Sequence, residues 1–274
     1  MTSMSGTSTD TSSTAELAVV TGASSGIGLS LARQFVQHGF DVIAVAEDDE
    51  LAAAADTLTA EGGSVTAVRA DLATEAGVET TYEAIRTDGR PVAAAALNAG
   101  IGVGGGRFDQ TPLEDDLRLA DLNVRSTVHL AKLLVRDMVA RGQGRLLFTS
   151  SIAAKAPGPY HATYAASKAF VHSFAEGIRH ELKDTGVVVT SLMPGPTDTE
   201  FFDRANMQDS AIGGSSKKDD PEDVARDGFE ALMAGKDHVV AGSSMNKAQT
   251  ASGQALPDKA AAAVQAKMTK PRGD

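Results

Sequence analysis

From residue 17 onward, short apolar runs alternate with longer stretches that have helical periodicity. The apolar runs are rich in Val and Ala and are continuous rather than alternating, as expected of strands buried on both faces. This alternation predicts a single doubly wound, Rossmann-like α/β domain, in which a parallel seven-stranded sheet carries helices on both faces. The expected strands are Leu17–Thr21, Asp41–Ala46, Ser64–Arg69, Val92–Asn98, Arg145–Ser150, Val187–Met193 and His238–Ala241. The expected helices are about Gly26–His38, Asp48–Glu61, Glu75–Arg86, Leu113–Arg141, Thr163–Lys183 and Pro221–Ala234.

The domain organisation follows from the same pattern. Residues 17–247 are expected to form one catalytic domain. Residues 1–16 are rich in Ser and Thr and are expected to be a disordered tail, whereas the Ala-rich residues 248–274 are expected to form one helix from about Pro257. The first residues lack the basic start and apolar stretch of a signal peptide. No apolar run approaches the roughly 18–20 residues of a membrane-spanning helix, so we expect no membrane partner.

Composition excludes several chemistries. The chain has no cysteine, which rules out disulfides, thiolate nucleophiles and cysteine-bound metal centres and is compatible with a cytoplasmic location. Its formal net charge of -11 would repel phosphate backbones, so nucleic acid is not an expected partner. The six histidines do not have the HExxH spacing of a metal site, and no metal is predicted.

The first strand runs directly into a glycine-rich turn, Thr21-Gly22-Ala23-Ser24-Ser25-Gly26-Ile27-Gly28, and a helix follows. Glycines at a strand-to-helix turn let the backbone approach a pyrophosphate, and the helix N-terminus offers free N–H groups and a positive dipole end. A tight turn without a ligand remains the alternative, because a lone glycine turn is a weak signal. The turn predicts a dinucleotide site.

Three acids, Glu47, Asp48 and Asp49, lie where the second strand ends. A carboxylate there can accept hydrogen bonds from the ribose hydroxyls of adenosine and repels the extra phosphate of NADP. No Lys or Arg occurs in residues 24–25 or 46–51 to bind that phosphate. The acids favour NAD, with NADP as the alternative cofactor. The competing interpretation is that they cap the next helix, with Asp48 the first candidate for that role.

Tyr164 and Lys168 are four residues apart at the start of an expected helix and therefore share a face. An ammonium beside a phenol would favour the phenolate and lower the pKa of Tyr164 from about 10, which suits a general acid/base. Ser151 follows the fifth strand, where its hydroxyl could hold a substrate oxygen. Taken alone, the Tyr–Lys pair could be a helix-surface pair without function. Its conjunction with the glycine turn points to acid/base chemistry.

These motifs together resemble those of the short-chain dehydrogenase/reductase family, over roughly Leu17 to Gly242. The TGxxxGxG turn, the YxxxK pair and the separation of thirteen positions from Ser151 to Tyr164 match that family. Further matches are Asp71 and Leu72 on the adenine side, the strand end Asn98-Ala99-Gly100, the tetrad asparagine Asn123, and Pro194, Gly195, Thr197 and Thr199 in a PGxxxT segment.

The resemblance implies an oxidoreductase that transfers a hydride between NAD(P) and a secondary alcohol or ketone. It implies a catalytic tyrosine, a lysine that orients the nicotinamide ribose, a serine that fixes the substrate, and a water relay held by Asn123. It also implies a homodimer or homotetramer formed through the two long helices. The expected catalytic residues are Ser151, Tyr164, Lys168 and Asn123, and the expected cofactor contacts are Gly22, Ser24, Ser25, Gly26, Ile27, Gly28, Glu47, Asp71, Leu72, Asn98, Ala99, Gly100, Tyr164, Lys168, Pro194, Gly195, Thr197 and Thr199.

One departure from the family concerns the acid that reads the ribose. NAD-using relatives often carry it at the strand end, where this chain has Ala46, and Glu47 occupies a slot that NADP-using relatives often fill with arginine. Alternative functions are a catalytically silent nucleotide sensor, an NADP-dependent carbonyl reductase, and a sugar-nucleotide epimerase or dehydratase. Two interpretations are open for Phe201, Phe202, Met207 and Ile212: an apolar lid over the nicotinamide and substrate, or packing on the core or on a partner subunit. His161 is a candidate substrate contact, and a loop side chain without a ligand is the alternative.

Overall fold

The computed structural model describes residues 15–243 and 257–271. The expected tail at residues 1–14, and residues 244–256 and 272–274, lie outside the described part. The strands are β1 (Leu17–Thr21), β2 (Asp41–Ala46), β3 (Val65–Arg69), β4 (Val92–Leu97), β5 (Gly144–Thr149), β6 (Val187–Met193) and β7 (His238–Val240). The helices are α1 (Gly26–Gln37), α2 (Glu50–Ala60), α3 (Glu75–Asp88), α4 (Leu113–Ala120), α5 (Thr127–Arg141), α6 (Ala162–Glu181), α7 (Phe201–Arg204), α8 (Pro221–Met233) and α10 (Asp258–Thr269), with a π-helical turn η1 (Asp121–Ser126) and a 3₁₀ turn η2 (Ile152–Lys155).

The strands form one seven-stranded parallel sheet in the order β3-β2-β1-β4-β5-β6-β7. Strands β2 and β3 lie on one side of β1, and β5, β6 and β7 lie on the far side of β4, so the strand order reverses between β1 and β4. Helices α1, α2 and α8 cover one face of the sheet, and α3, α5 and α6 cover the other. The predicted doubly wound fold is confirmed, and its reversal point is where such folds bind ligands.

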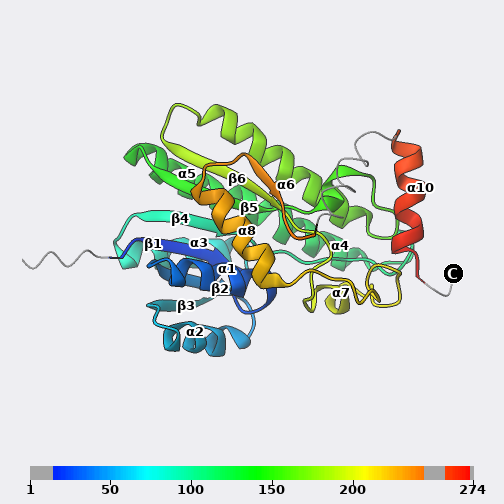
Figure 1. The fold of residues 1–274 in the computed structure, drawn as a ribbon, viewed down its shortest axis with the longest axis horizontal. Coiled ribbons are helices and arrows are strands. Elements are labelled where there is room, and N and C mark those ends of the chain that lie inside the picture. The colour runs from blue at the N-terminus through cyan, green and yellow to red at the C-terminus, as the bar shows by residue number, and fades with distance from the viewer. Residues whose placement is uncertain (1–14, 244–256, 272–274) are drawn as a thin grey trace, which may run out of the picture.

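Two apolar layers hold the helices to the sheet, one on each face. On one face, α1 and α8 pack together, and Figure 1 shows both lying across the strands; the ring centroids of Phe35 and Phe229 are 5.2 Å apart in an edge-to-face contact. On the other face, Phe148 of β5 meets Phe174 of α6 with centroids 5.8 Å apart. Small Ala side chains in β1, β2 and β4 let these helices approach the strands closely.

The two edge strands differ from the expectation that every strand is buried on both faces. In β3, Thr66, Ala67 and Arg69 are exposed, and in β7, His238 is exposed while the next two residues are half-buried. An edge strand has a neighbour on one side only and lies at the margin of the helical layers, so its side chains are less covered. An apolar run alone does not distinguish a central strand from an edge strand.

The long helix expected at Leu113–Arg141 is interrupted. It consists of α4, the π-helical turn η1 and α5. A π-helical turn holds one more residue than an α-helical turn, and such turns are frequent at functional sites. The interruption contains Asn123, which is buried.

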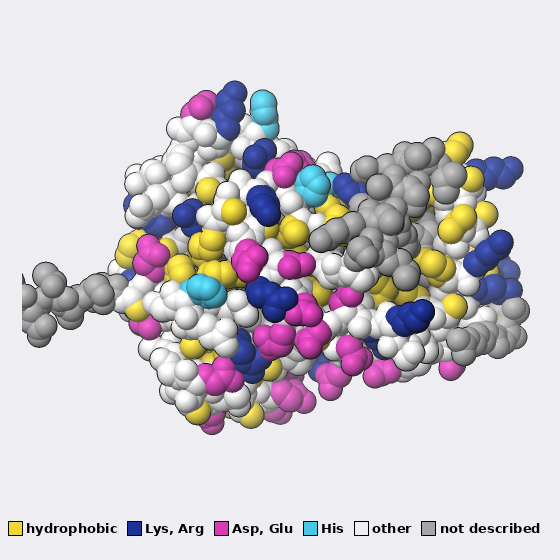
Figure 2. Space-filling model, viewed as in Figure 1, with side chains coloured by type: hydrophobic (Ala, Val, Ile, Leu, Met, Phe, Trp, Pro, Cys, Tyr) yellow, Lys and Arg dark blue, Asp and Glu magenta, His cyan; other side chains and the backbone are white. Residues whose placement is uncertain are grey.

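Helices α7 and α10 both lie toward the right-hand end of the view in Figure 1. The stretch where we expect a C-terminal helix contains α10, from Asp258 to Thr269. On the face drawn in Figure 2, acidic side chains are interspersed with Lys and Arg side chains. Among the described residues, no helix combines the length and the apolar character that crossing a membrane requires.

Candidate active site

A large cleft lies at the carboxyl ends of the central strands, with a cavity volume of about 270 Å³. One end is lined by the glycine turn and the residues that follow β2 and β3. The middle is lined by the residues that follow β4 and β5, together with Tyr164 and Lys168 of α6. The other end is lined by the loop after β6, by α7 and by α10. The cleft therefore joins the expected cofactor turn to the expected acid/base pair.

The glycine turn needs its glycines for different reasons. Gly22 and Gly26 have φ values of +66° and +53°, which side chains other than glycine rarely adopt. A Cβ on Gly28 would lie 1.8 Å from the carbonyl oxygen of Gly22, and a Cβ on Gly26 would lie 2.9 Å from the side chain of Thr199. The turn is thus folded tightly on itself and against the loop after β6, and the N-terminus of α1 opens into the cleft.

Thr21 and Asn98 fasten the glycine turn to the end of β4. The Thr21 hydroxyl oxygen accepts hydrogen bonds from the backbone N–H groups of Asn98 at 2.9 Å and Ala99 at 3.0 Å. The Asn98 side-chain amide donates to the Thr21 carbonyl at 3.1 Å. Two strand ends are thereby held in register at the point where the strand order reverses, which makes this side of the cleft rigid.

The acids after β2 take up separate positions. Glu47 pairs with Arg118 of α4 at 2.5 Å, and Arg118 also contacts Asp71 at 3.1 Å. The Asp48 carboxylate accepts a hydrogen bond from the Ser24 hydroxyl at 2.8 Å. The N-cap residue of α2 is Asp49, whose side chain makes no capping hydrogen bond. The interpretation of Asp48 as the helix cap is therefore wrong. The pairing of Glu47 with Arg118 was not predicted, because Arg118 lies 71 residues after Glu47.

Tyr164 and Lys168 come from the first turns of α6, as predicted; Lys168 is buried and Tyr164 is half-buried. The Lys168 ammonium donates to the Thr149 carbonyl at 2.9 Å and lies 5.8 Å from the centre of the Tyr164 ring. Ser151 follows β5, and its side chain is near enough to Tyr164 to oppose the rise of the Tyr164 pKa. The three expected catalytic side chains converge at the middle of the cleft.

The pKa of Tyr164 contradicts the expectation from sequence. Burial raises the pKa of Tyr164 to about 12, and the hydrogen bond with Ser151 opposes that rise only in part. Burial also lowers the pKa of Lys168 to about 8. The expected lowering of the Tyr164 pKa by a neighbouring ammonium is therefore wrong for this structure, because burial removes the phenolate from water and so disfavours the charged form. At neutral pH the phenol is protonated and can act as a proton donor.

Asn123 does not line the cleft but lies directly behind it, in the π-helical turn. Its Oδ1 accepts from the Ile101 N–H at 2.9 Å, and its Nδ2 donates to the Ile101 carbonyl at 2.9 Å and to Ser167 at 3.0 Å. A Cβ on Gly100 would lie 3.0 Å from the Asn123 Oδ1 and 3.2 Å from the Lys168 Nζ. Gly100 thus leaves the space between the asparagine and the lysine.

The substrate side of the cleft is apolar. The Phe201 ring lies 5.0 Å from the Tyr164 ring, and Phe202, Ala205 and Met207 form a small buried cluster with Ile212 packed against it. His161 is buried and lines the cleft, and burial lowers its pKa, so it is neutral at neutral pH. These positions agree with the expected apolar lid over the substrate.

Helix α10 closes this side of the cleft, and sequence reasoning assigned it no role. Gln265, Met268 and Thr269 line the cleft. The Thr269 hydroxyl donates to the Pro159 carbonyl at 2.8 Å, and the Met268 carbonyl accepts from the Ile212 N–H at 3.0 Å. The helix carries no recognisable motif, so nothing in its sequence could have linked it to residues more than fifty positions earlier.

Every residue expected at the site lines the cleft, with the exception of Asn123. The residues that sequence reasoning missed lie at the strand ends or in the loops that follow them, next to or on α7, on α10, and, for Leu122, in the π-helical turn. The missed residues are Ala46, Ala70, Ile101, Gly102, Leu122, Thr149, Ser150, Ile152, Ala153, Pro196, Glu200, Arg204, Gln265, Met268 and Thr269.

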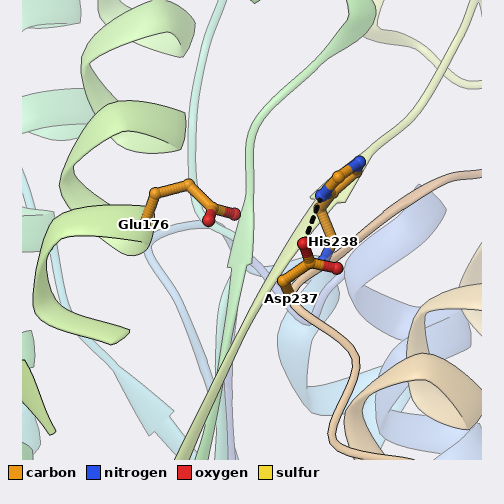
Figure 3. Close-up of side chains that lie close together, drawn as sticks. All are labelled: Glu176, Asp237 and His238. Carbon is orange, nitrogen blue, oxygen red and sulfur yellow. Dashed lines mark hydrogen bonds and ion pairs between the residues drawn. The ribbon is translucent and has the colours of Figure 1, made fainter. Parts of the chain in front are cut away.

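A second group of charged side chains lies outside the cleft, between α6 and the start of β7. Donor atoms of Glu176, Asp237 and His238 all lie within 4.8 Å of one another, and Figure 3 shows Glu176 extending from α6 toward the other two. His238 contacts Asp237 at 3.2 Å. Lys155 is near enough to interact electrostatically with Glu176, so its ammonium offsets the carboxylate charge. We assign no metal to this group.

Comparison with known proteins agrees with the geometry. A family model described as short chain dehydrogenase matches residues 16–210. The chain belongs to the short-chain dehydrogenase family. It is 36% identical over 218 residues to the 1-deoxy-11-beta-hydroxypentalenate dehydrogenase of Streptomyces exfoliatus, covering 78% of each chain. It is 31% identical over 221 residues to the oxidoreductase UcpA of Salmonella typhimurium, covering 80% of this chain and 81% of that one.

Solved structures of short-chain dehydrogenases have the same fold. One from Sphingobium yanoikuyae, in complex with NADPH, has a TM-score of 0.76 and 29% identity, over 82% of this chain and 87% of that one. One from Burkholderia phymatum, in complex with NAD, has a TM-score of 0.75 and 26% identity, over 82% of this chain and 88% of that one. This short-chain dehydrogenase is therefore an oxidoreductase by family.

The cleft has features that fit a dinucleotide. Four buried side-chain atoms have no hydrogen-bond partner among the described residues, and two of them, Asp48 Oδ1 and Thr149 Oγ1, belong to residues that line the cleft. The first lies at the glycine-turn end and the second at the Lys168 end. Buried polar atoms are costly when left unpaired, and a ligand with hydroxyl and amide groups would pair them.

Proposed function

We propose that this short-chain dehydrogenase transfers a hydride between NAD and one carbon of a substrate with an apolar body: the carbinol carbon of a secondary alcohol or the carbonyl carbon of a ketone. The observation that carries the proposal is the Tyr164 phenol, which lies beside Ser151 in the same cleft as the glycine turn. A protonated phenol in an enclosed site is suited to give a proton to a developing alkoxide.

Each functional residue of the cleft has a separate role in this proposal. A bound nicotinamide would supply or accept the hydride. Ser151 holds the substrate oxygen next to Tyr164, and Tyr164 donates its proton to that oxygen in the reductive direction. Lys168 would hold the nicotinamide ribose with its ammonium, which is kept in place by the Thr149 carbonyl. Asn123, braced by Ile101 and Ser167, positions the neighbouring backbone behind the lysine and would hold the water of a proton relay.

The apolar substrate side supports a substrate with an apolar body. Phe201, Phe202, Met207, Ile212 and Met268 all line the cleft beyond Tyr164. Enclosed apolar walls favour a bulky apolar group over a small hydrated one. A relative with 36% identity is named for a hydroxypentalenate substrate, which is consistent with this size and character.

The choice of NAD rests on electrostatics. Glu47, Asp48 and Asp71 place three carboxylates at the glycine-turn end of the cleft, and the single guanidinium of Arg118 that pairs with Glu47 and Asp71 leaves net negative charge where the extra phosphate of NADP would lie. NADP remains the alternative, since solved relatives are in complex with NADPH in one case and NAD in another.

A panel of secondary alcohols and ketones of increasing apolar size, assayed with both cofactors, tests the proposal. We expect turnover that rises with apolar size and is faster with NAD(H) than with NADP(H). Saturable NADH binding without turnover of any panel member would favour a catalytically silent nucleotide sensor. Tyr164→Phe serves as the control for background reduction.

We also propose that the protein assembles as a homodimer or homotetramer through α5 and α6. Val139 of α5 and Phe170 of α6 each leave 38% of their surface exposed, although both are apolar. Light scattering of the purified protein should give a mass of two or four chains, and Phe170→Glu should lower it. A monomer at micromolar concentration would contradict this assignment.

A further inference from the structure

Residues 102–106, Gly-Val-Gly-Gly-Gly, form a glycine segment that follows β4 and has no role in the proposed function. Glycine loses more conformational freedom on folding than any other residue, so several glycines in one ordered segment need a physical reason. The reason is found in what a side chain would meet at each position. Three of these glycines would collide with residues 201–207 if they carried a Cβ, whereas Gly106 would not.

The space that a side chain on Gly102 would occupy is filled by the Phe201 ring. A Cβ on Gly102 would lie 2.5 Å from Cζ and 2.9 Å from Cε2 of Phe201. Non-bonded carbon atoms pack about 3.5–4.0 Å apart, so a methyl group and the ring cannot share this space. The same ring lines the cleft, with its centroid 5.0 Å from that of Tyr164. The apolar wall next to the acid/base residue therefore rests on Gly102.

The next two glycines accommodate the chain that follows α7. A Cβ on Gly104 would lie 2.7 Å from Cγ and 2.8 Å from Sδ of Met207, which is buried and lines the cleft. Gly105 has a φ of +77°, and a Cβ there would lie 1.9 Å from the carbonyl oxygen of Asn206. Asn206 itself has a φ of +55°. The backbone after α7 thus turns directly against the glycine segment.

The start of α7 is fixed against the cofactor half of the cleft. The Thr199 hydroxyl oxygen accepts a hydrogen bond from the Phe201 N–H at 3.3 Å, and a Cβ on Gly26 would lie 2.9 Å from the Thr199 side chain. Because the backbone is held at both ends of α7, a collision at Gly102 has to be relieved by movement of the Phe201 ring. The unfilled space next to that ring is the cleft.

We propose that Gly102 and Gly104 determine substrate specificity: because they lack side chains they seat Phe201 and Met207, and they thereby set how large an apolar group the cleft accepts beside Tyr164. The inference rests on the proposed function and adds to it the residues that limit substrate size. A methyl group on Gly102 would displace the Phe201 ring by about 1 Å or more into the substrate half. The glycine turn that forms the cofactor end belongs to another segment and would keep its geometry.

Gly102→Ala, assayed with NADH on ketones of increasing apolar size, tests the proposal. We expect kcat/KM to fall about tenfold or more for the bulkiest ketone that the unmodified protein reduces, and less than about threefold for the smallest. The NADH dissociation constant should stay the same, and Gly104→Ala should act in the same direction. Gly106→Ala is the matched control, because its added Cβ would have 3.9 Å to the nearest atom. Gly102, Gly104 and Gly106 all have negative φ, so alanine is not strained by the backbone there.

A compensating substitution separates the loss of space from a general distortion of the loop. Phe201→Leu in the Gly102→Ala variant removes the ring atoms that the methyl group strikes, and it should restore the ratio of kcat/KM for bulky and small ketones to within about threefold of the original ratio. Phe201→Leu alone should shift that ratio toward bulkier ketones, and this result does not depend on the folding of the glycine variants.

The proposal is overturned if Gly102→Ala lowers kcat/KM equally for ketones of all sizes, or if Gly106→Ala has the same effect. It is also overturned if Phe201→Leu neither restores the ratio in the Gly102→Ala variant nor changes it alone. Failure of the unmodified protein to reduce any ketone with either cofactor would instead overturn the proposed function itself.

Discussion

The two halves of the cleft are built in different ways. The cofactor half consists of strand ends and the glycine turn, and backbone contacts hold it: Thr21 and Asn98 join β1 to β4, and a side chain on Gly28 would strike the Gly22 carbonyl. The substrate half consists of side chains from a long loop, from the four-residue α7 and from α10. It is held by a few bonds, among them Thr269 to Pro159.

This contrast explains how one scaffold can serve many substrates. A half that is fixed by backbone geometry tolerates little change, so it suits a cofactor common to all members of the family. A half that is formed by side chains on loops can be altered one residue at a time without disturbing the sheet. Tyr164 lies at the boundary between the two halves, where a bound cofactor and a bound substrate would be in contact.

The largest effect is expected at that boundary. Tyr164→Phe removes the proton donor but retains the ring contact with Phe201, so turnover should fall by about 10²- to 10⁴-fold with little change in the NADH dissociation constant. Steady-state assays and fluorescence titration measure the two quantities separately. Retention of full turnover would remove Tyr164 from the mechanism.

The second effect tests the rigidity of the cofactor half. Gly28→Ala forces a methyl group against the Gly22 carbonyl, 1.8 Å from its oxygen, and should weaken NADH binding more than about tenfold or lower the melting temperature by several degrees. Gly177→Ala on α6 is the control, since nothing lies within 4 Å of its added Cβ. If both variants bind NADH equally well and are equally stable, the close backbone packing at Gly28 is not required for the cofactor half to bind NADH.

The third effect tests the independence of the substrate half. Met268→Ala removes part of the apolar wall that α10 contributes to the cleft. The KM of an apolar ketone should therefore rise about three- to tenfold while the NADH dissociation constant stays the same. Val264→Ala, on the same helix but with 51% of its residue surface exposed, is the control. A change in NADH affinity comparable to the change in KM would show that the halves are coupled.

The smallest effect lies outside both halves. Burial, together with the nearby Lys155 charge, lowers the pKa of His172 to about 4, below its ordinary value of 6.5. The folded state thus disfavours the protonated ring, so stability is complete above pH 6.5 and decreases as pH falls from there toward 4. His172→Gln should make the fall in the free energy of unfolding between pH 7 and pH 5 smaller by roughly 1 kcal/mol, a figure reduced because solvent screens a half-buried ring. Urea unfolding at pH 7 and pH 5 measures it, and an unchanged difference between the two pH values would contradict it.

The cofactor half could be predicted from the sequence because its residues follow strands directly and form short motifs. The turn at Gly22, Gly26 and Gly28 and the Tyr164–Lys168 pair are of this kind, and all lie in the cleft. The alternation of strands and helices predicted a doubly wound parallel sheet but not the order of its strands, and the exposure of β3 depends on its place at the sheet edge, which its own residues do not reveal.

The remaining features depend on contacts between distant segments. The Glu47–Arg118 pair spans 71 positions and the Thr269–Pro159 bond spans 110. No local pattern encodes either contact. The pKa of Tyr164 was mispredicted for a related reason: the sequence showed the neighbouring lysine, but it did not show how completely the fold would remove the phenol from water.

The π-helical turn at Asp121–Ser126 makes the length of this segment as important as its residues. Deletion of the extra residue within the turn would let the helix return to regular α geometry, whereas deletion of one residue between Arg118 and the turn would rotate α4 by about 100° relative to the helix that follows, given 3.6 residues per turn. Arg118 and Asn123 lie on the same continuous helical segment, one before and one within the turn. A chain shortened by a single position between Arg118 and the turn would therefore keep every sequence motif and still misalign Arg118 with Asn123.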